Sequence, residues 1–525
     1  MPRVLIADKL SDDAADILRE RGVEVDVETG LSPDDLIARI SAYEGLAVRS
    51  ATKATAEVIA AADNLKVIGR AGIGVDNIDV AAATQRGVVV MNTPFGNAIT
   101  TAEHAIAMMM ALARQIPAAD RSMRAGKWEK SKFVGVELAG KVLGLVGCGN
   151  IGSIVASRAQ GLRMRVIAHD PFLAPERARE LGIERVGLDD LMSRADVISV
   201  HAPLNDATRD LIGAPELAMA RPGIRVVNCA RGGIVNEDAL YDALQSGHVA
   251  GAALDVFTTE PPEGSPLLGL ENVVTTPHLG ASTAEAQEKV ARQIAEQMGD
   301  YLIHGAVSNA LNMPSITPEE APLLEPYMLL ARQLGSFAGQ LTRSGLRAVT
   351  IEYEGHVATL NTRPLTAIVL AGLLEPIVET VNMVNAPVVA QDRDIDVAEV
   401  RHDRPGDYQT LMRVSVTTEN RERDVAGTLF ANGHPRLVRV KGISIEAEVT
   451  PHMLYITNRD VPGIIGFLGQ TLGEADLNIA TFNLGRAEAG GDAIALISVD
   501  QQIPPSVLAT LRSHEGIQQA VSLRF

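Results

Sequence analysis

Short apolar runs alternate with amphipathic stretches through the first three hundred residues of the chain. Residues 1–91 contain five apolar runs that predict buried strands, at Val4–Ala7, Val23–Val27, Gly45–Val48, Leu65–Ile68 and Val88–Met91. Apolar residues at helical spacing in 12–21, 33–42 and 55–62 predict the helices between them. This order of strands and helices predicts a parallel sheet with helices on both faces.

The alternation resumes after a long helix predicted at 101–114. Apolar runs predict further strands near 142–146, 164–168, 196–201, 224–228, 250–255 and 272–275, and a helix is expected at 283–304. The two regions together predict an α/β fold with two Rossmann-like, doubly wound parallel sheets.

The pattern of apolar and polar residues changes near residue 313. Acidic residues flanked by prolines at 318–322 predict a linker, and residues 323–450 mix helices with strands that look antiparallel, such as 348–353, 410–417 and 437–440. Residues 451–525 read as strand, helix, strand, strand, helix, strand. We therefore expect an α+β intervening domain at 314–450 and a small βαββαβ domain at 451–525.

A glycine-rich turn at residues 147–152 predicts a dinucleotide site. Gly147 allows a tight turn off the preceding strand, Gly149 lets backbone approach a pyrophosphate, and Gly152 lets the next helix pack closely. Asp170 follows the next strand, where a carboxylate would bind the ribose hydroxyls and repel a 2′-phosphate. The sequence therefore predicts NAD rather than NADP as the cofactor.

Polar residues follow several of the later strands, so their side chains are expected at one edge of the sheet. Arg231, Glu260 and His278 stand out among them. A histidine with a pKa of about 6.5 can take the proton of an alcohol, and a carboxylate beside it would orient the ring. An arginine can bind a substrate carboxylate through two hydrogen bonds.

The remaining histidines and the cysteines receive plainer interpretations. His201 is expected to line the cofactor pocket and His104 to pack within its helix. Cys148 and Cys229 are read as small packing residues, because neither has a base beside it in sequence and their spacing fits no metal motif.

Two loops of the first region also follow strands. Arg49 and Ser50 end one strand, and 70–77 (RAGIGVDN) end another. A ligand-binding rim is one interpretation, since ligands sit at the carboxyl ends of strands in open α/β sheets. A solvated arginine and an ordinary glycine turn are the alternative.

Composition narrows the class of protein. Net charge is −18 with no extended basic run, which argues against a nucleic-acid surface. The first apolar run is too short for a signal peptide, and the apolar helices are too short to span a membrane. With two widely separated cysteines, the chain is expected in the cytoplasm, without a membrane partner.

These motifs together resemble the D-isomer-specific 2-hydroxyacid dehydrogenases over essentially the whole chain. The stretches that carry the resemblance are 70–79 (RAGIGVDNID), 147–152, 228–236 (NCARGGIVN), 255–262 (DVFTTEPP) and 276–283 (TPHLGAST). The resemblance implies a discontinuous substrate-binding domain at 1–96 and 289–313 around a NAD-binding domain at 97–288. It also implies that 451–525 form an ACT domain.

The resemblance also implies roles for particular residues. His278 would be the acid–base, Glu260 its partner and Arg231 the carboxylate anchor. The cofactor would contact Gly147, Gly149, Asn150, Ile151, Gly152, Asp170, His201, Pro203, Cys229, Ala230, Asp255, Gly280 and Ala281. The substrate would contact Arg49, Ser50, Gly72, Ile73, Gly74 and Asn97, with Lys130 reaching it from a neighbouring subunit.

One position departs from the pattern of some relatives. They place a second arginine two residues after the one matching Arg49, where this chain has Ala51. The phosphate of a substrate must then find a second cation elsewhere, and Lys53 is a candidate.

The resemblance implies NAD-dependent oxidation of 3-phosphoglycerate to 3-phosphohydroxypyruvate, the entry to phosphorylated serine biosynthesis. L-Serine is the expected effector, at Asn458, Asp460 and Asn478 of the ACT domain, and a homotetramer is the expected assembly. Residues 314–450 resemble a domain that some relatives use as a second anion site, with Arg436, Arg439 and Lys441 as its basic residues or simply a solvated strand face. Two alternatives stay open: a dehydrogenase for another D-2-hydroxy acid, and an NADH-sensing binding protein like the corepressors that share this fold.

Overall fold

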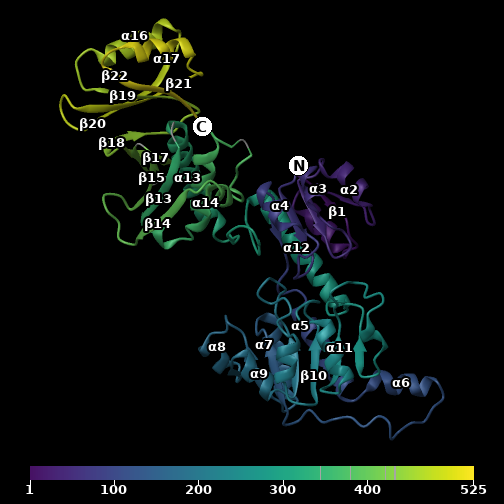
Figure 1. Ribbon diagram of the computed structural model, residues 1–525. Coiled ribbons are helices and arrows are strands. Elements are labelled where there is room, and N and C mark those ends of the chain that lie inside the picture. The colour runs from purple at the N-terminus through teal and green to yellow at the C-terminus, as the bar shows by residue number, and fades with distance from the viewer. Residues whose placement is uncertain (343–344, 379, 420, 431–432) are drawn as a thin grey trace. The chain divides into compact units, whose positions relative to one another are not determined.

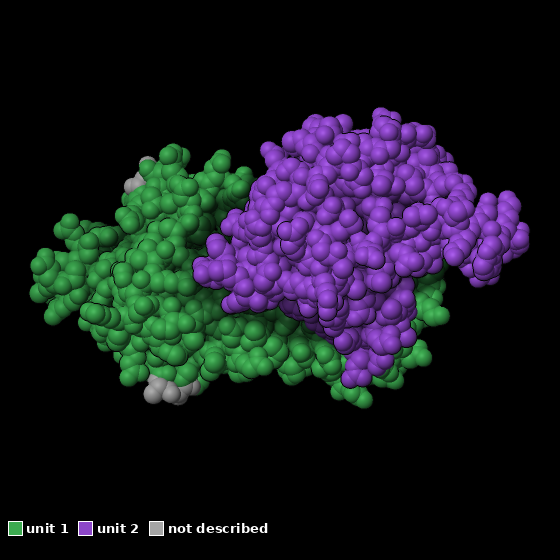
Figure 2. Space-filling model, turned by 90° about the horizontal axis from the view of Figure 1, so that it is seen from below, with its two compact units in different colours: residues 1–70, 74–92, 294–525 green, residues 71–73, 93–293 purple. Residues whose placement is uncertain are grey.

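The computed structural model describes residues 1–342, 345–378, 380–419, 421–430 and 433–525. The chain divides into two compact units (Figure 2). Unit 1 holds residues 1–70, 74–92 and 294–525, and unit 2 holds residues 71–73 and 93–293.

Unit 1 begins with the sheet that contains β1 (Figure 1), in which five parallel strands have the order β2-β1-β3-β4-β5. Its strands are β1 (Arg3–Ile6), β2 (Glu24–Val27), β3 (Gly45–Val48), β4 (Val67–Arg70) and β5 (Val89–Met91). Its helices are α1 (Asp13–Glu20), α2 (Pro33–Ile40), α3 (Ala56–Ala60) and α4 (Val80–Gln85). The central strands are buried on both faces, which is why their sequences read as continuous apolar runs.

This first sheet is completed by residues from much later in the chain. Helix α12 (Ala284–His304) packs Met298 into the space left by Gly45 and Gly69, which have no side chains. Met91 at the end of β5 pairs with Ala310 in an antiparallel bridge. The sheet therefore depends on two segments separated by residues 93–293 of unit 2.

Unit 2 is built on a seven-stranded parallel sheet in the order β12-β11-β10-β9-β6-β7-β8. Its strands are β6 (Val142–Val146), β7 (Arg165–His169), β8 (Glu184–Arg185), β9 (Val197–Val200), β10 (Ile224–Asn228), β11 (Val249–Leu254) and β12 (Val273–Thr275). Its helices are α5 (Ala98–Ala113), α6 (Ile116–Arg124), α7 (Asn150–Gly161), α8 (Pro175–Glu180), α9 (Leu188–Arg194), α10 (Ala214–Met219) and α11 (Glu237–Gln245), with a 3₁₀ turn, η1 (Pro266–Gly269). The strand order reverses direction beside β6, which is where open α/β sheets bind ligands.

The later part of unit 1 contains two more sheets. A six-stranded sheet in the order β14-β13-β15-β16-β17-β18 is followed by a four-stranded antiparallel sheet in the order β20-β21-β19-β22. The strands are β13 (Leu346–Gly355), β14 (Asp396–His402), β15 (Thr410–Thr418), β16 (Glu422–Leu429), β17 (Pro435–Val440), β18 (Ile443–Ala447), β19 (His452–Arg459), β20 (Ile479–Arg486), β21 (Asp492–Val499) and β22 (Ile517–Arg524). The helices are α13 (Ala321–Leu341), α14 (Arg363–Leu374), α15 (Ala386–Asp392), α16 (Ile464–Glu474) and α17 (Pro505–Ser513), with a 3₁₀ turn, η2 (His356–Thr359).

The predicted fold class is confirmed. The two doubly wound sheets, the mixed α+β region and the βαββαβ order after residue 451 are all present. Details differ: α4 lies in a stretch where no helix was predicted, and α5 begins at Ala98 rather than Thr101. The predicted strands at β13, β15 and β17 have the expected antiparallel neighbours, but β14, which was not predicted, pairs with β13 in parallel.

Candidate active site

The three glycines of the turn after β6 have separate structural reasons. Gly147 has φ +91°, and a Cβ there would lie 2.8 Å from the backbone of His201. A Cβ on Gly152, in α7, would lie 2.4 Å from the Gly147 carbonyl oxygen. A Cβ on Gly149 would meet nothing within 4 Å, so this residue faces open space. The turn therefore needs the outer two glycines for its own packing, and Gly149 keeps backbone accessible to a ligand.

Asp170 lies beyond β7, beside the glycine turn. One carboxylate oxygen accepts the Cys148 N–H at 2.8 Å, and the other accepts the Phe172 N–H at 2.8 Å. The side chain is thus held in place by the backbone of the glycine turn and of the residues just after β7. This position next to the turn is the one required for binding an adenosine ribose, so the residues fit NAD.

The strand order gathers the predicted cofactor and catalytic residues at one edge of the seven-stranded sheet. Because all its strands are parallel, residues that follow β7, β6, β9, β10, β11 and β12 lie along the same carboxyl edge. In that order along the edge come Asp170, then the turn Gly147, Gly149, Asn150, Ile151 and Gly152, then His201 and Pro203, then Cys229, Ala230 and Arg231, then Asp255 and Glu260, then His278, Gly280 and Ala281.

The loop that carries Arg231 is shaped by its neighbours. The Asn228 side chain donates to the Arg231 carbonyl at 2.9 Å and accepts the Ala230 N–H at 3.0 Å. A Cβ on Gly232 would lie 2.0 Å from the Phe257 backbone, so the loops after β10 and β11 are packed directly together. Arg231 itself is half-buried at the edge of the sheet.

Glu260 and His278 form a carboxylate–histidine pair. His278 Nδ1 lies 2.7 Å from Glu260 Oε2, and Glu260 Oε1 accepts the Phe257 N–H at 3.1 Å. Both side chains are partly exposed, at 48% for His278 and 37% for Glu260. With its Nδ1 proton held by the carboxylate, the imidazole presents Nε2 as a base.

His278 is held in a left-handed backbone conformation. Its φ is 54°, which costs roughly 1–2 kcal/mol for a residue with a side chain. Such a residue persists where surrounding contacts fix it, and it is a frequent feature of active sites. A cavity of about 380 Å³ opens beside it, lined among others by Asp255, Phe257, Glu260 and Pro261.

Asp255 holds this loop from behind and is almost fully buried, at 1% exposure. Its carboxylate accepts the Thr276 hydroxyl at 2.5 Å, the Leu279 N–H at 2.7 Å and the Gly280 N–H at 2.8 Å. Burial opposes ionisation, yet hydrogen bonds from His104, Thr276 and Leu279 outweigh it and lower the pKa of Asp255. The carboxylate is therefore charged and fixed at neutral pH.

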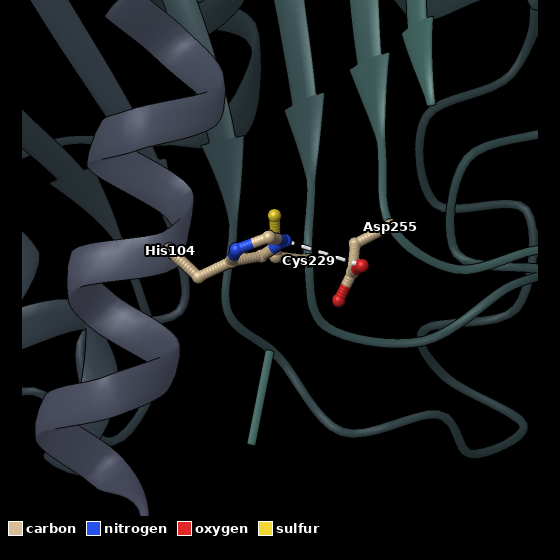
Figure 3. A group of neighbouring side chains, drawn as sticks. All are labelled: His104, Cys229 and Asp255. Atoms are coloured by element: carbon tan, nitrogen blue, oxygen red, sulfur yellow. Dashed lines mark ion pairs between the residues drawn. The ribbon is translucent and has the colours of Figure 1, made fainter. Parts of the chain in front are cut away.

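His104 is the residue that sequence reasoning misjudged. It was expected to be a packing residue of its helix, but its Nε2 lies 3.2 Å from Asp255 Oδ1 (Figure 3) and 3.2 Å from Thr276 Oγ1. No local signal marked it, because Asp255 is 151 positions away in the sequence. A single histidine within an otherwise apolar stretch of helix is the feature that could have drawn attention to it.

The third side chain of this group is Cys229. Ligand atoms of His104, Cys229 and Asp255 lie within 4.8 Å of one another, a spacing open to a metal ion (Figure 3). The chemistry of the group argues against one, since the Asp255 oxygens already accept several hydrogen bonds and burial raises the pKa of the Cys229 thiol. The packing role expected for Cys229 agrees with this environment.

Two other buried groups beside the turn stay neutral. Burial lowers the pKa of His201 to about 4, and its Nε2 lies 2.8 Å from the Ser199 hydroxyl. Burial and the nearby Asp170 raise the pKa of Cys148 to about 11. Neither group carries charge at neutral pH, so neither contributes to the electrostatic charge at this edge of the sheet.

The loop of Arg49 and Ser50 lies at the carboxyl edge of the five-stranded sheet, in unit 1. Asp8, which follows β1 and is 4% exposed, organises it. Its carboxylate accepts the N–H groups of Arg49 at 2.6 Å and Thr52 at 3.0 Å, and the Thr52 hydroxyl at 2.6 Å. Asn77 adds a hydrogen bond to the Arg49 carbonyl at 3.0 Å.

Sequence reasoning also missed Asp8. Its only signal is a carboxylate directly after a buried strand, and the loop it holds begins 41 positions later. Ala51 and Lys53 are both exposed on the same loop.

The other expected substrate residues are distributed over both units. Gly74 belongs to unit 1, whereas Gly72, Ile73, Asn97 and Lys130 belong to unit 2. Asn97 is buried, and its Oδ1 has no hydrogen-bond partner. Lys130 is exposed on the long segment after α6, where Trp128 is 79% exposed.

The residues expected to bind an effector lie at two places in the four-stranded region. Asn458 is buried at the end of β19 with its Oδ1 unpartnered, and Asp460 accepts from Arg486 at 2.9 Å. Asn478 donates to Asp500 at 2.7 Å.

The three basic residues of the six-stranded region each contact a different group. Arg436 lies 3.2 Å from Glu448, Arg439 lies 3.6 Å from Asp407, and Lys441 lies 5.6 Å from the Tyr455 ring.

A known protein family matches the part of the chain that forms this edge of the sheet. The family described as D-isomer specific 2-hydroxyacid dehydrogenase, NAD binding domain, matches residues 106–280. The glycine turn, the acidic residue and the carboxylate–histidine pair thus define an NAD-dependent oxidoreductase of the D-2-hydroxyacid dehydrogenase class. A second family, the D-3-phosphoglycerate dehydrogenase intervening domain, matches residues 323–441.

Relatives that match almost the whole chain identify one family within this class. A D-3-phosphoglycerate dehydrogenase of Archaeoglobus fulgidus is 44% identical over 99% of both chains, and one from Synechocystis is 43% identical over all of this chain and 95% of the relative. The chain belongs to the D-3-phosphoglycerate dehydrogenase family. Among solved structures, the TT0316 protein from Thermus thermophilus is 37% identical with a TM-score of 0.55, covering 59% of this chain and 99% of its own. Among the described residues, no helix is long and apolar enough to cross a membrane.

Proposed function

We propose that this chain oxidises the C2 hydroxyl of 3-phospho-D-glycerate to the ketone of 3-phosphohydroxypyruvate. The observation that carries the proposal is the Glu260–His278 pair, 2.7 Å apart, on the same sheet edge as the glycine turn in a member of this family. NAD, when bound, supplies the acceptor for the hydride that leaves C2.

The protein's own residues account for the remaining requirements of the reaction. His278 takes the hydroxyl proton on Nε2, because Glu260 occupies Nδ1 and stabilises the imidazolium that forms. Arg231, after β10 and two strands along the edge from His278, binds the C1 carboxylate, which sets the hydrogen on C2 in one orientation. In the reverse direction, the same imidazolium returns the proton to the ketone oxygen.

Arg49 and Ser50 are the proposed phosphate site. The backbone of their loop is fixed by Asp8, so the guanidinium starts from a rigid base. Arginine suits a phosphate because its planar N–H groups match two phosphate oxygens. Lys53, exposed on the same loop, is the proposed second cation in place of the missing arginine at position 51.

The organisation of the chain is proposed to follow from these roles. Residues 1–96 and 289–313 bind substrate, 97–288 bind NAD, 314–450 form the intervening domain and 451–525 form an ACT domain. L-Serine is the proposed effector at Asn458, Asp460 and Asn478, and a homotetramer the proposed assembly, in which Lys130 of one subunit contacts the substrate of another. The proposed location is the cytoplasm.

The experiment that tests the proposal compares NADH consumption with 3-phosphohydroxypyruvate and with hydroxypyruvate. A kcat/KM at least tenfold higher for the phosphorylated substrate supports the proposal and corresponds to about 1.4 kcal/mol of transition-state discrimination. Equal values would leave the hydride chemistry and open the substrate to other D-2-hydroxy acids. No turnover with any 2-oxo acid, together with NADH-dependent binding of another protein, would favour a binding function instead.

Arg49→Ala separates the phosphate contact from the rest of the site. We expect it to abolish the preference for the phosphorylated substrate while the rate with hydroxypyruvate stays within threefold. Lys53→Ala should produce a smaller loss in the same direction, and a preference unchanged in both variants would place the phosphate elsewhere.

A further inference from the structure

The starting point is the left-handed conformation of His278. Its φ is 54° and its ring contacts Glu260, and few residues with a side chain adopt this conformation without being held in it. The peptide N–H of His278 donates to the Asp255 carbonyl at 2.9 Å. The next two N–H groups, of Leu279 and Gly280, both donate to the Asp255 carboxylate. One residue therefore fixes three successive peptide groups around the proposed base.

Asp255 can hold this loop only while its carboxylate is charged and correctly oriented. The side chain is completely buried, so water does not stabilise its charge. Its hydrogen-bond donors include two peptides and a threonine hydroxyl, all from the loop that it holds. A donor anchored outside the loop is needed to fix the carboxylate itself.

His104 meets that requirement. It projects from α5, a sixteen-residue helix that packs against the sheet, toward Asp255 (Figure 3). Its Nε2 also lies 3.2 Å from the Thr276 hydroxyl. With its proton on Nε2, the imidazole donates to Asp255 Oδ1 at 3.2 Å. A helix is a more rigid support than the loop, so the imidazole transmits that rigidity to the carboxylate.

We propose that His104 is a positioning residue for the dehydrogenase reaction, acting through Asp255 to keep His278 aligned with Glu260 and the substrate. Two carboxylate–histidine pairs then stand in series at this edge. The exposed pair, Glu260 and His278, carries the proton transfer, and the buried pair, Asp255 and His104, fixes the backbone of the first. The inference rests on the proposed function only in assigning the base to His278.

The test replaces His104 by residues that keep or remove the Nε2 donor. His104→Leu removes it at similar size, and His104→Gln places an amide donor near the same position. We expect kcat of His104→Leu to fall at least tenfold, with the Kd for NADH, measured by protein fluorescence, within threefold of wild type. His104→Gln should recover kcat to within threefold of wild type.

The matched control is Glu103→Gln, one position earlier on the same helix, where the side chain is exposed and 3.5 Å from Arg158. It should leave kcat unchanged. Equal loss in the Leu and Gln variants, or a kcat within twofold of wild type in His104→Leu, would overturn the proposal. A parallel loss of NADH affinity in His104→Leu would also overturn it, because the defect would then lie in the pocket as a whole.

A double-mutant cycle guards against a general folding defect. If His104 acts through His278, His104→Leu should cost little further activity in a His278→Gln background, where the base is already absent. An undiminished loss in that background would contradict the proposal. The comparisons use whichever 2-oxo acid the wild-type protein reduces, so a wrong substrate assignment would appear in the wild type and not in these ratios.

Discussion

The carboxyl edges of the two parallel sheets use the same structural device for different purposes. At each, a buried aspartate follows a strand and binds the loop that follows the neighbouring strand, through backbone N–H groups (three for Asp8 and two for Asp255) and one threonine hydroxyl. Asp8 does this for the loop of Arg49, and Asp255 does it for the loop of His278. Burying a carboxylate is costly unless it is fully hydrogen-bonded. Each aspartate therefore holds its loop in place, and the hydrogen bonds from that loop compensate for the burial of the carboxylate.

The difference between the edges lies in what else the aspartate contacts. Asp255 has a histidine from a helix behind it, and its loop adopts a left-handed residue at His278. The loop of Asp8 presents an arginine from ordinary backbone, which can bind an anion over a range of geometries. Proton transfer tolerates smaller displacements than charge attraction, so the extra support stands where chemistry occurs.

The largest expected effect separates chemistry from binding. His278→Asn removes the base, and kcat should fall about 10³-fold because general acid–base catalysis contributes on the order of 10²–10⁴. The Kd for NADH should stay within threefold, measured by fluorescence titration. Turnover near the wild-type rate would exclude His278 as the acid–base.

A substitution of Asp8 tests the carboxyl edge of the five-stranded sheet. Asp8→Asn weakens the acceptor of the Arg49 loop, so the KM for 3-phosphohydroxypyruvate should rise about tenfold while kcat stays within threefold. Asp12→Asn, an exposed residue four positions later, is the control and should change neither. A fall in kcat without a change in KM would mean that the two edges do not divide the work in this way.

Two glycines on α7 test how the glycine turn binds the cofactor. Gly152→Ala places a methyl group 2.4 Å from the Gly147 carbonyl, so NADH should bind about tenfold more weakly. Gly161→Ala, at the far end of α7 with nothing within 4 Å, should leave the Kd unchanged. Equal effects would mean that helix packing does not control the turn.

The smallest expected effect concerns acid stability. The pKa of His201 is lowered to about 4 by burial, below its ordinary value near 6.5, so the unfolded chain binds more protons between these values. His201 therefore contributes stability above pH 6.5 that is lost as pH falls toward 4. Between pH 7 and pH 5 this loss should be about 1–2 kcal/mol.

Thermal unfolding at the two pH values, compared with His201→Gln, measures that loss. The variant should lose less stability than wild type on acidification, and an equal loss would show that the ring is not held neutral.

The sequence predicted those parts of the site that stand directly after apolar runs. Gly147, Arg231 and His278 each follow a strand, and a parallel sheet necessarily gathers such positions at one edge. Asp8 and His104 were not predicted as site residues, because their partners lie 41 and 151 positions away and a single polar residue near an apolar stretch has many ordinary explanations. Parallel pairing of β14 with β13 likewise depends on tertiary packing rather than on alternation within either strand.

The way the first sheet is completed has a consequence for biosynthesis. Met91 pairs with Ala310, and the Val90 N–H donates to the Asn312 side chain at 2.9 Å, yet unit 2 occupies most of the chain between them. At roughly 5–20 residues per second, a ribosome needs on the order of 10–40 s to make the intervening segment. During that interval the β5 edge of the five-stranded sheet lacks these partners. Residues 93–293 of unit 2 emerge meanwhile and can fold. In a nascent chain, the last segment that packs on the five-stranded sheet thus leaves the ribosome after every strand of the seven-stranded sheet.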